Sequence, residues 1–202
     1  MCVSILLMLG VTVHTEVWGD EASEAYDKGI RYLSEGRQRD AITAFDTAIR
    51  LNPRSAEAYQ GRGMAYNETG KNEQALKDYD AALALNPQYA EAYFNRGNVY
   101  SDLGQHARAL KDYDEAVRLD SNHSGAMFNR SLASMFLRRT EMAADARAYV
   151  KLKGWKDDRV QYMVIFGAFG ERWAQRETEA RQLLDEAAAN CNTSSWPYPI
   201  IR

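Results

Sequence analysis

The chain has 202 residues, of which 46% are hydrophobic and 26% are charged, and its formal net charge is −3. These proportions are those of an ordinary soluble globular protein. The slightly acidic balance argues against a nucleic-acid partner, because non-specific binding to nucleic acid needs a basic surface. The only cysteines are Cys2 and Cys191, so no internal disulfide framework is expected.

The first nineteen residues differ in composition from the rest of the chain. An apolar run extends from Val3 to Val13, and the first basic residue is Lys28. The run is too short to span a bilayer but has the length of the apolar core of a signal peptide. We therefore expect residues 1–19 to be a signal peptide that is cleaved before Asp20, leaving a mature chain with no integral membrane span. If the leader is instead an ordinary helix, the protein is cytoplasmic.

From residue 22 onward the sequence repeats with a period of 34 residues. Four kinds of position recur in register, namely a glycine, an alanine, an aromatic residue and a second alanine. They are Gly29, Gly63 and Gly97; Ala41, Ala75 and Ala109; Phe45, Tyr79 and Tyr113; and Ala48, Ala82 and Ala116. A period of this length is typical of a helical solenoid, in which each repeat is stabilised mainly by its neighbours.

Each repeat is predicted to form two helices. In the second repeat, Tyr59, Gly63 and Tyr66 fall on one face of a first helix. The second helix is expected to end before an Asn-Pro pair, as at Asn52 and Asn86, because proline cannot continue a helix. Between the two helices a glycine recurs where a left-handed turn residue is favoured, at Gly36, Gly70 and Gly104.

These residues resemble the tetratricopeptide repeat family, whose pattern is aromatic, small, glycine and aromatic, followed by Ala, aromatic, Ala and Pro over 34 positions. The resemblance covers residues 22–55, 56–89 and 90–123, with Ser121 in place of the last proline. It implies an all-α, tetratricopeptide-type helical solenoid of antiparallel helix pairs.

Beyond residue 123 the spacing persists while the chemistry changes. The unit 124–157 has serines, at Ser131 and Ser134, at core positions of its first helix. Terminal repeats are expected to be atypical because their outer face meets water. We assign residues 20–157 to the solenoid, with 124–157 as a degenerate repeat, and residues 158–202 to a degenerate fifth repeat, a Trp-rich cap and a tail.

The tail Trp196–Ile201 is similar to a segment that follows the repeats in bacterial envelope members of the family. Together with the leader, this resemblance implies an exported bacterial protein of the periplasm.

No pattern of catalytic or cofactor-binding residues is found. The three histidines, His14, His106 and His123, lack metal-ligand spacing, and no phosphate-binding glycine loop or nucleophile motif occurs. Acidic pairs such as Asp78 with Asp80 are expected to be solvated, whereas acid–base catalysis needs a buried environment. We expect a protein that is not an enzyme and has no cofactor and no metal site.

Three arginines recur one period apart, at Arg62, Arg96 and Arg130. The guanidinium fork of such an arginine can pair with Asp78 or Asp112 across the helix pair and fix the packing. We expect these arginines to be structural.

The resemblance implies that ligands lie along a concave groove formed by the first helices. The candidate groove residues are Met64, Phe94, Asn95, Asn98, Phe128 and Asn129. Asn95 and Asn129 lie one period apart, at a position where family members grip an extended peptide backbone with asparagine amides, which both donate and accept hydrogen bonds. Phe94 and Phe128 would be apolar anchors. The alternative is that these side chains only pack within the solenoid.

We therefore expect a non-catalytic protein–protein interaction scaffold or adaptor that binds an extended segment of a partner protein. The acidic groups would favour a neutral or basic peptide, and Glu91 replaces a basic position with which co-chaperone relatives clamp a terminal carboxylate. One alternative is a self-assembling component that acts through the solenoid ends or the Trp-rich cap. A second is an undetected enzyme in the C-terminal third, around Trp155, Trp173 and Cys191. The pattern predicts no particular oligomeric state.

Overall fold

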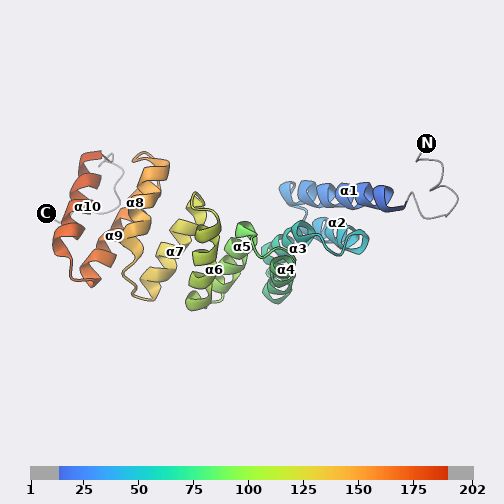
Figure 1. Ribbon diagram of the computed structural model, residues 1–202, viewed down its shortest axis with the longest axis horizontal. Coiled ribbons are helices and arrows are strands. Elements are labelled where there is room, and N and C mark those ends of the chain that lie inside the picture. The colour runs from blue at the N-terminus through green and yellow to red at the C-terminus, as the bar shows by residue number, and fades with distance from the viewer. Residues whose placement is uncertain (1–13, 191–202) are drawn as a thin grey trace, which may run out of the picture. The chain divides into compact units, whose positions relative to one another are not determined.

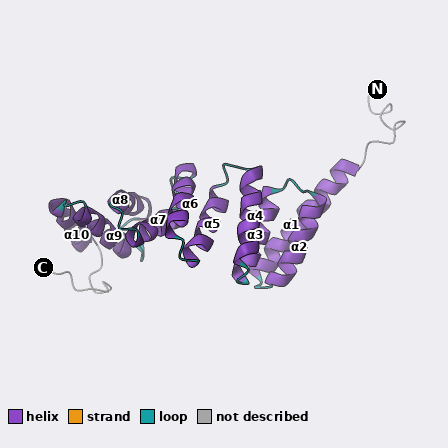
Figure 2. Cartoon of the chain, turned by 90° about the horizontal axis from the view of Figure 1, so that it is seen from below, coloured by secondary structure: helices purple, strands orange, loops and turns teal. Residues whose placement is uncertain are grey.

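The computed structural model describes residues 14–190, and the side chains from residue 21 onward; the apolar leader and the tail with Cys191 and Trp196 lie outside them. Within this part of the chain every regular element is an α-helix, and short turns join the helices (Figure 1, Figure 2). The helices are α1 (His14–Ser34), α2 (Gln38–Leu51), α3 (Ala56–Glu68), α4 (Asn72–Leu85), α5 (Ala90–Asp102), α6 (His106–Leu119), α7 (Ser124–Phe136), α8 (Met142–Lys153), α9 (Val160–Trp173) and α10 (Glu177–Asn190). The predicted all-α fold of paired helices is confirmed.

Contacts divide the chain into two compact units, Met1–Asn95 and Arg96–Arg202, with the boundary inside α5. In the first unit α1 pairs with α2, and both pack against α3, which pairs with α4. In the second unit α6, α7, α8, α9 and α10 pack in succession. None of the helices that are described has the length and apolarity needed to cross a membrane.

The helices of the first unit are held together by aromatic rings lying on glycines. A Cβ atom built at Gly29 would lie 2.5 Å from Cε1 of Phe45, and one built at Gly61 would lie 2.6 Å from the same atom. Phe45 is fully buried, so the first helices of two successive repeats approach it closely. The next repeat uses the same arrangement, with Gly63 against the ring of Tyr79. The recurrent glycines therefore mark the places where an aromatic side chain fills the space between helices.

The helix ends follow the sequence prediction. The turn glycines Gly36, Gly70 and Gly104 have φ values of 70°, 72° and 70°, which is the left-handed region that glycine tolerates best. The side chain of Asn52 accepts a hydrogen bond from the Arg54 backbone at 3.1 Å, directly after α2. Asp120 makes the same turn after α6, accepting from Asn122 at 2.9 Å. A side-chain acceptor therefore stabilises this turn even where Ser121 replaces proline.

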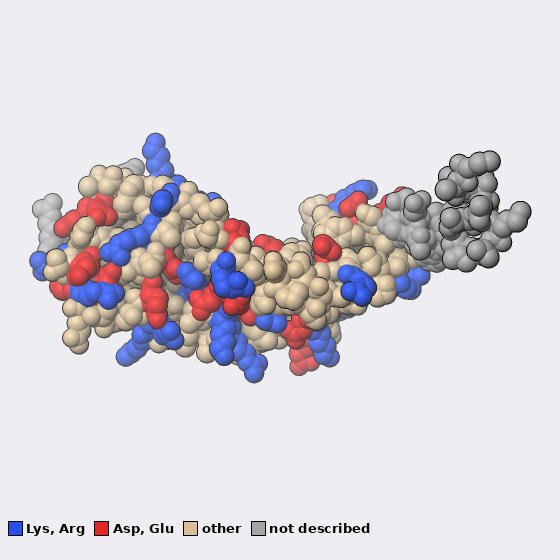
Figure 3. Space-filling view, viewed as in Figure 1, with Lys and Arg blue, Asp and Glu red and all other residues tan. Residues whose placement is uncertain are grey.

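Two of the recurrent arginines form forked ion pairs, as predicted. Arg62 donates to both carboxylate oxygens of Asp78 at 2.7 Å, and Arg96 binds Asp112 at 2.8 and 2.7 Å. Asp78 and Asp112 are each only 5% exposed, so the expectation that Asp78 is solvated was wrong. A bidentate guanidinium offsets the desolvation of the buried carboxylate. Elsewhere acidic and basic side chains intermingle on the surface (Figure 3).

The third arginine shows a change of register in the second unit. Arg130 binds Asp145 through both of its fork nitrogens, and Ser131 also donates to that carboxylate at 3.2 Å. The period of 34 would place the acid at position 146, which is Ala146. The same ion pair is thus kept although the spacing has shortened by one residue.

The last four helices share one apolar cluster. Its largest fully buried side chains are Met142, Tyr149, Met163, Val160 and Val164. α9 approaches α10 and α8 at Gly167, where a Cβ would lie 2.7 Å from Leu183 and 2.8 Å from Ala146. The C-terminal part of the described chain is thus a fifth helix pair packed on α7 and α8.

The predicted leader overlaps the first helix. α1 begins at His14, so a cleavage before Asp20 would fall within it.

Candidate functional site

Two of the predicted groove residues, Asn98 of α5 and Asn129 of α7, are brought together in the second unit. Oδ1 of Asn98 accepts hydrogen bonds from the Tyr113 hydroxyl at 2.9 Å and from Nδ2 of Asn129 at 2.8 Å. Burial raises the pKa of Tyr113 to about 12, so the phenol remains a neutral donor at physiological pH. We refer to Asn98, Tyr113 and Asn129 as the amide cluster.

The amide cluster leaves two hydrogen-bonding groups unused. Within the described part of the chain no partner engages Nδ2 of Asn98 or Oδ1 of Asn129. Both asparagines are partly exposed. One amide donor and one amide acceptor are the groups that a peptide bond complements. The cluster is therefore chemically suited to holding a peptide backbone without reading its sequence.

Asn129 also has a packing role. It hydrogen-bonds to the hydroxyl of Tyr113, the buried aromatic of the preceding repeat. Two periods earlier, the aromatic residue is Phe45, which has no hydroxyl, and Gly61 stands in the place of Asn129. The asparagine thus serves the core with its NH₂ group and keeps its carbonyl oxygen for another partner.

Asn95, the other predicted amide, lies at the end of the first unit. Its Nδ2 atom is buried and has no hydrogen-bond partner among the described residues. A buried donor without a partner costs about 1–3 kcal/mol, and such a group calls for a functional or structural explanation. Phe94 precedes it and is partly exposed.

Phe128 is largely engaged in packing. Its ring centroid lies 5.9 Å from that of Phe166, and the guanidinium of Arg159 lies 5.8 Å from the Phe128 centroid. It packs against the apolar cluster of the last four helices. The side chain of Phe128 thus packs within the second unit and is at the same time partly exposed.

Met64 lies on α3 in the first unit. Its sulfur accepts a hydrogen bond from Nε2 of Gln60 at 3.0 Å, and Gln60 is only 5% exposed. Met64 therefore provides a hydrogen-bond acceptor for the buried amide of Gln60, while the Met64 side chain is itself partly exposed.

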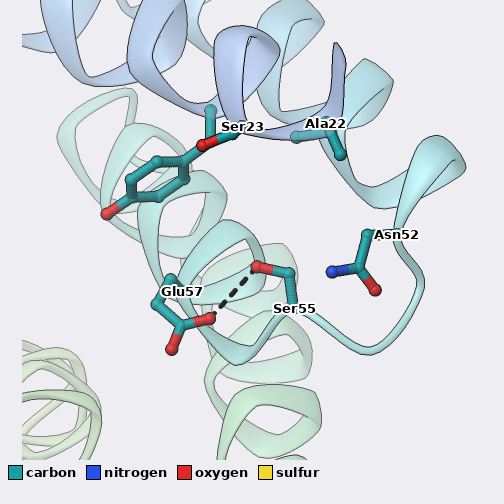
Figure 4. A pocket seen from close by; sticks show the side chains of 7 residues that line it. Ala22, Ser23, Asn52, Ser55 and Glu57 are labelled. Carbon is teal, nitrogen blue, oxygen red and sulfur yellow. Dashed lines mark hydrogen bonds between the residues drawn. The ribbon is translucent and has the colours of Figure 1, made fainter. Parts of the chain in front are cut away.

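A pocket in the first unit was not predicted. It has a volume of about 270 Å³ and lies beside α1, the α2–α3 turn and the start of α3 (Figure 4). Its lining residues are Ala22, Ser23, Tyr26, Ala48, Asn52, Ser55 and Glu57. Since these residues come from three segments and only some recur with the period, the repeat pattern alone gave no signal for it.

Two tryptophans of the C-terminal third are engaged in apolar or ring contacts. Trp155 packs against the apolar cluster, and Trp173 stacks on Phe169 at 6.1 Å. Among the described side chains, no three or more of His, Cys, Asp or Glu gather so that they could hold a metal ion.

Comparison with protein-family models identifies the class of fold. The model of the TPR repeat matches residues 29–70 and 63–104, and that of the tetratricopeptide repeat matches residues 90–123. Residues 29–123 therefore consist of tetratricopeptide repeats, and over these residues the predicted resemblance to the tetratricopeptide repeat family is confirmed. No curated protein matches the chain significantly.

Solved structures share this fold over most of the chain. MamA matches with a TM-score of 0.70 at 15% identity, covering 91% of this chain and all (100%) of that one. YrrB, described as a TPR protein with an unusual peptide-binding site, matches with a TM-score of 0.68 at 19% identity, covering 85% of this chain and 87% of its own. The first TPR of Spaghetti (RPAP3), bound to the HSP90 peptide SRMEEVD, matches at 28% identity and a TM-score of 0.57, covering 59% of this chain and 94% of its own.

Proposed function

We propose that this protein is a non-catalytic interaction scaffold that binds an extended segment of a partner protein along the first helices of its repeats. The proposal is supported by the tetratricopeptide repeats and by structural neighbours that bind peptides. The observation that carries it is the amide cluster, whose unused donor and acceptor match a peptide group.

The binding mode follows from the chemistry of the amides. Nδ2 of Asn98 would donate to a carbonyl oxygen of the partner, and Oδ1 of Asn129 would accept from an N–H group. Each such hydrogen bond contributes about 0.5–1.5 kcal/mol, so several contacts along the segment are needed for useful affinity.

The experiment is a crosslinking capture from extract of the source cell, with the full chain as bait. The test variant is Asn95→Ala/Asn129→Ala, and the control is Asn67→Ala, an asparagine on α3. Circular dichroism checks that each variant is folded. We expect a partner that the wild type and Asn67→Ala capture and the double variant loses. Equal capture by all three baits would reject the proposed role of these amides.

A second candidate function is self-assembly through the C-terminal helices. On α9, Tyr162, Phe169 and Trp173 lie on one face and are 42%, 41% and 40% exposed. Such a row of exposed aromatic side chains is typical of an interaction surface. Light scattering tests it: a mass that rises with concentration and falls back in Trp173→Lys favours assembly, and a constant monomer mass rejects it.

We also propose that residues 1–19 direct export to a bacterial periplasm, as the apolar run from Val3 to Val13 indicates. N-terminal sequencing of the protein from fractionated cells tests this. A periplasmic protein that begins at Asp20 supports export, and an uncleaved cytoplasmic protein contradicts it.

A further inference from the structure

Five of the seven residues that line the pocket of the first unit carry a polar side-chain group. Ser23 and Tyr26 come from α1, Asn52 from the α2–α3 turn, and Ser55 and Glu57 from the start of α3 (Figure 4). Its volume of about 270 Å³ is below the roughly 300–1,000 Å³ of pockets that hold drug-sized ligands. A single side chain is therefore the better match in size.

Glu57 is the one charged group among the residues that line this pocket. Its carboxylate accepts a hydrogen bond from the Ser55 hydroxyl at 3.2 Å, and within the described chain it forms no ion pair with a lysine or arginine. The side chain is exposed, so an incoming cation can reach it without displacing a lysine or arginine. This distinguishes Glu57 from Asp78, which Arg62 already neutralises.

The surroundings of Glu57 are electronegative. Burial, followed by the charges of Glu57 and Asp27, raises the pKa of Tyr26. Burial also raises the pKa of Tyr89 to about 12, with added contributions from Tyr26, Glu57 and Glu91. Both phenols are therefore neutral, and their rings lie near a carboxylate that has no counter-ion.

We propose that this pocket receives a basic side chain, Arg or Lys, from the bound segment of the partner. Glu57 would form the ion pair, the ring of Tyr26 would lie against the cation, and the oxygens of Ser23 and Asn52 would accept its remaining N–H groups. A cation beside both a carboxylate and an aromatic face gains from each. An acidic side chain would be repelled at the same place.

This inference rests on the proposed function for its biological ligand, but the pocket can be tested alone. The probes are N-acetyl-arginine methylamide and its lysine analogue, with the citrulline analogue as a neutral isostere. They are titrated into the ¹⁵N-labelled full chain, and amide shifts are followed by NMR. We expect saturable shifts at Ser23, Ser55 and Glu57 with both cations, and at least tenfold weaker binding of citrulline.

Glu57→Gln and Glu73→Gln form a matched pair of variants. Each glutamate lies in the first turn of its helix, α3 or α4, so both substitutions change the helix terminus alike. Glu57→Gln should weaken binding of the arginine probe at least fivefold, and Glu73→Gln should leave it unchanged. Equal binding of arginine and citrulline, equal effects of the two variants, or no shift at these residues would overturn the proposal.

The outcomes separate this proposal from the general one. Binding of the arginine probe together with equal capture by all baits would retain the pocket and reject the amide role. Loss of capture in the Asn95→Ala/Asn129→Ala variant, together with no arginine binding, would support the amide role and reject the pocket.

Discussion

The first unit and the last four helices are built from the same helix pairs but are stabilised differently. In the first unit a large ring lies on a glycine where α1 meets α2, where α2 meets α3 and where α3 meets α4, as Phe45 does on Gly29 and Gly61. In the last four helices Ser131 stands at the glycine position, and a broad apolar cluster centred on Tyr149 and Met163 holds the helices together.

The difference shows two ways of specifying one fold. A ring on a glycine fixes both the distance and the register of two helices, so it must recur with the period. A broad cluster of methionine, valine and alanine side chains tolerates changes of spacing, because many residues share the packing. This explains how the second unit accommodates an ion pair that is one residue out of register, between Arg130 and Asp145.

The largest loss of stability is expected when an aromatic ring that lies on a glycine is removed. Tyr79→Ala should lower the free energy of unfolding by about 3–5 kcal/mol, because the ring is fully buried against Gly63. Tyr79→Phe should be nearly neutral, since Phe45 fills the same position one period earlier. Urea denaturation measures the free energy of unfolding of both variants. A loss above about 1 kcal/mol for Tyr79→Phe would show that the hydroxyl, and not the ring, stabilises the repeat.

The two carboxylates that bind Arg62, those of Asp78 and Asp46, should contribute differently to stability. Asp78→Asn should cost about 1–3 kcal/mol, because it removes a buried charged partner. Asp46→Asn should cost under about 1 kcal/mol, because the side chain of Asp46 is 52% exposed and its ion pair is solvated. Thermal unfolding of the two variants tests this order, which equal losses would contradict.

A methyl group added at a glycine of the first unit should be more costly than a change at the corresponding serine of the second unit. Gly63→Ala should destabilise by about 1–3 kcal/mol, although alanine is the better helix former, because its Cβ would lie 2.8 Å from the ring of Tyr79. Ser131→Ala in the second unit adds no atom and should cost about 1 kcal/mol for the lost hydrogen bond to Asp145. If Gly63→Ala stabilised the protein, the close approach of Gly63 to the ring of Tyr79 would be contradicted.

Alkaline pH should destabilise the second unit through its buried phenols. Burial raises the pKa of Tyr113 and of Tyr149 to about 12, above the ordinary value of 10.0. A raised folded pKa means that this stabilisation is complete below pH 10 and is lost as the pH rises through 12. Unfolding midpoints measured from pH 9 to 12 should fall, and Tyr149→Phe should reduce the fall. An unchanged midpoint across this range would refute the prediction.

The smallest stability effect is expected at Asn95. Asn95→Ala removes a buried donor that has no partner among the described residues, so stability should stay within about 1 kcal/mol of the wild type or rise. A loss above about 2 kcal/mol in urea denaturation would show that this amide is structural.

The repeats were predictable because each key contact uses residues that recur. The glycine turns, the aromatic rings and the pairing of Arg62 with Asp78 all follow from the period. The burial of Asp78 was missed, because sequence shows the charge but not the forked partner that allows it to be buried. The contact between Phe128 and Phe166 could not be predicted either, because it depends on a fifth helix pair whose sequence departs from the repeat pattern.

The candidate site was predictable only in part, for a similar reason. The period places Asn95 and Asn129 at one repeat position, but it does not show that Asn129 also binds Tyr113. The pocket at Glu57 joins residues from three segments, so it appears only when those segments are folded together.

Site-specific photo-crosslinking tests the central claim most directly. p-Benzoylphenylalanine is placed at position 94, beside Asn95, and in a second protein at position 173, on the exposed face of α9. If the first helices hold a partner, position 94 will crosslink to a different protein, and Asn95→Ala/Asn129→Ala will abolish that product. Crosslinks from position 173 to a second copy of the chain, with none from position 94, would contradict the account.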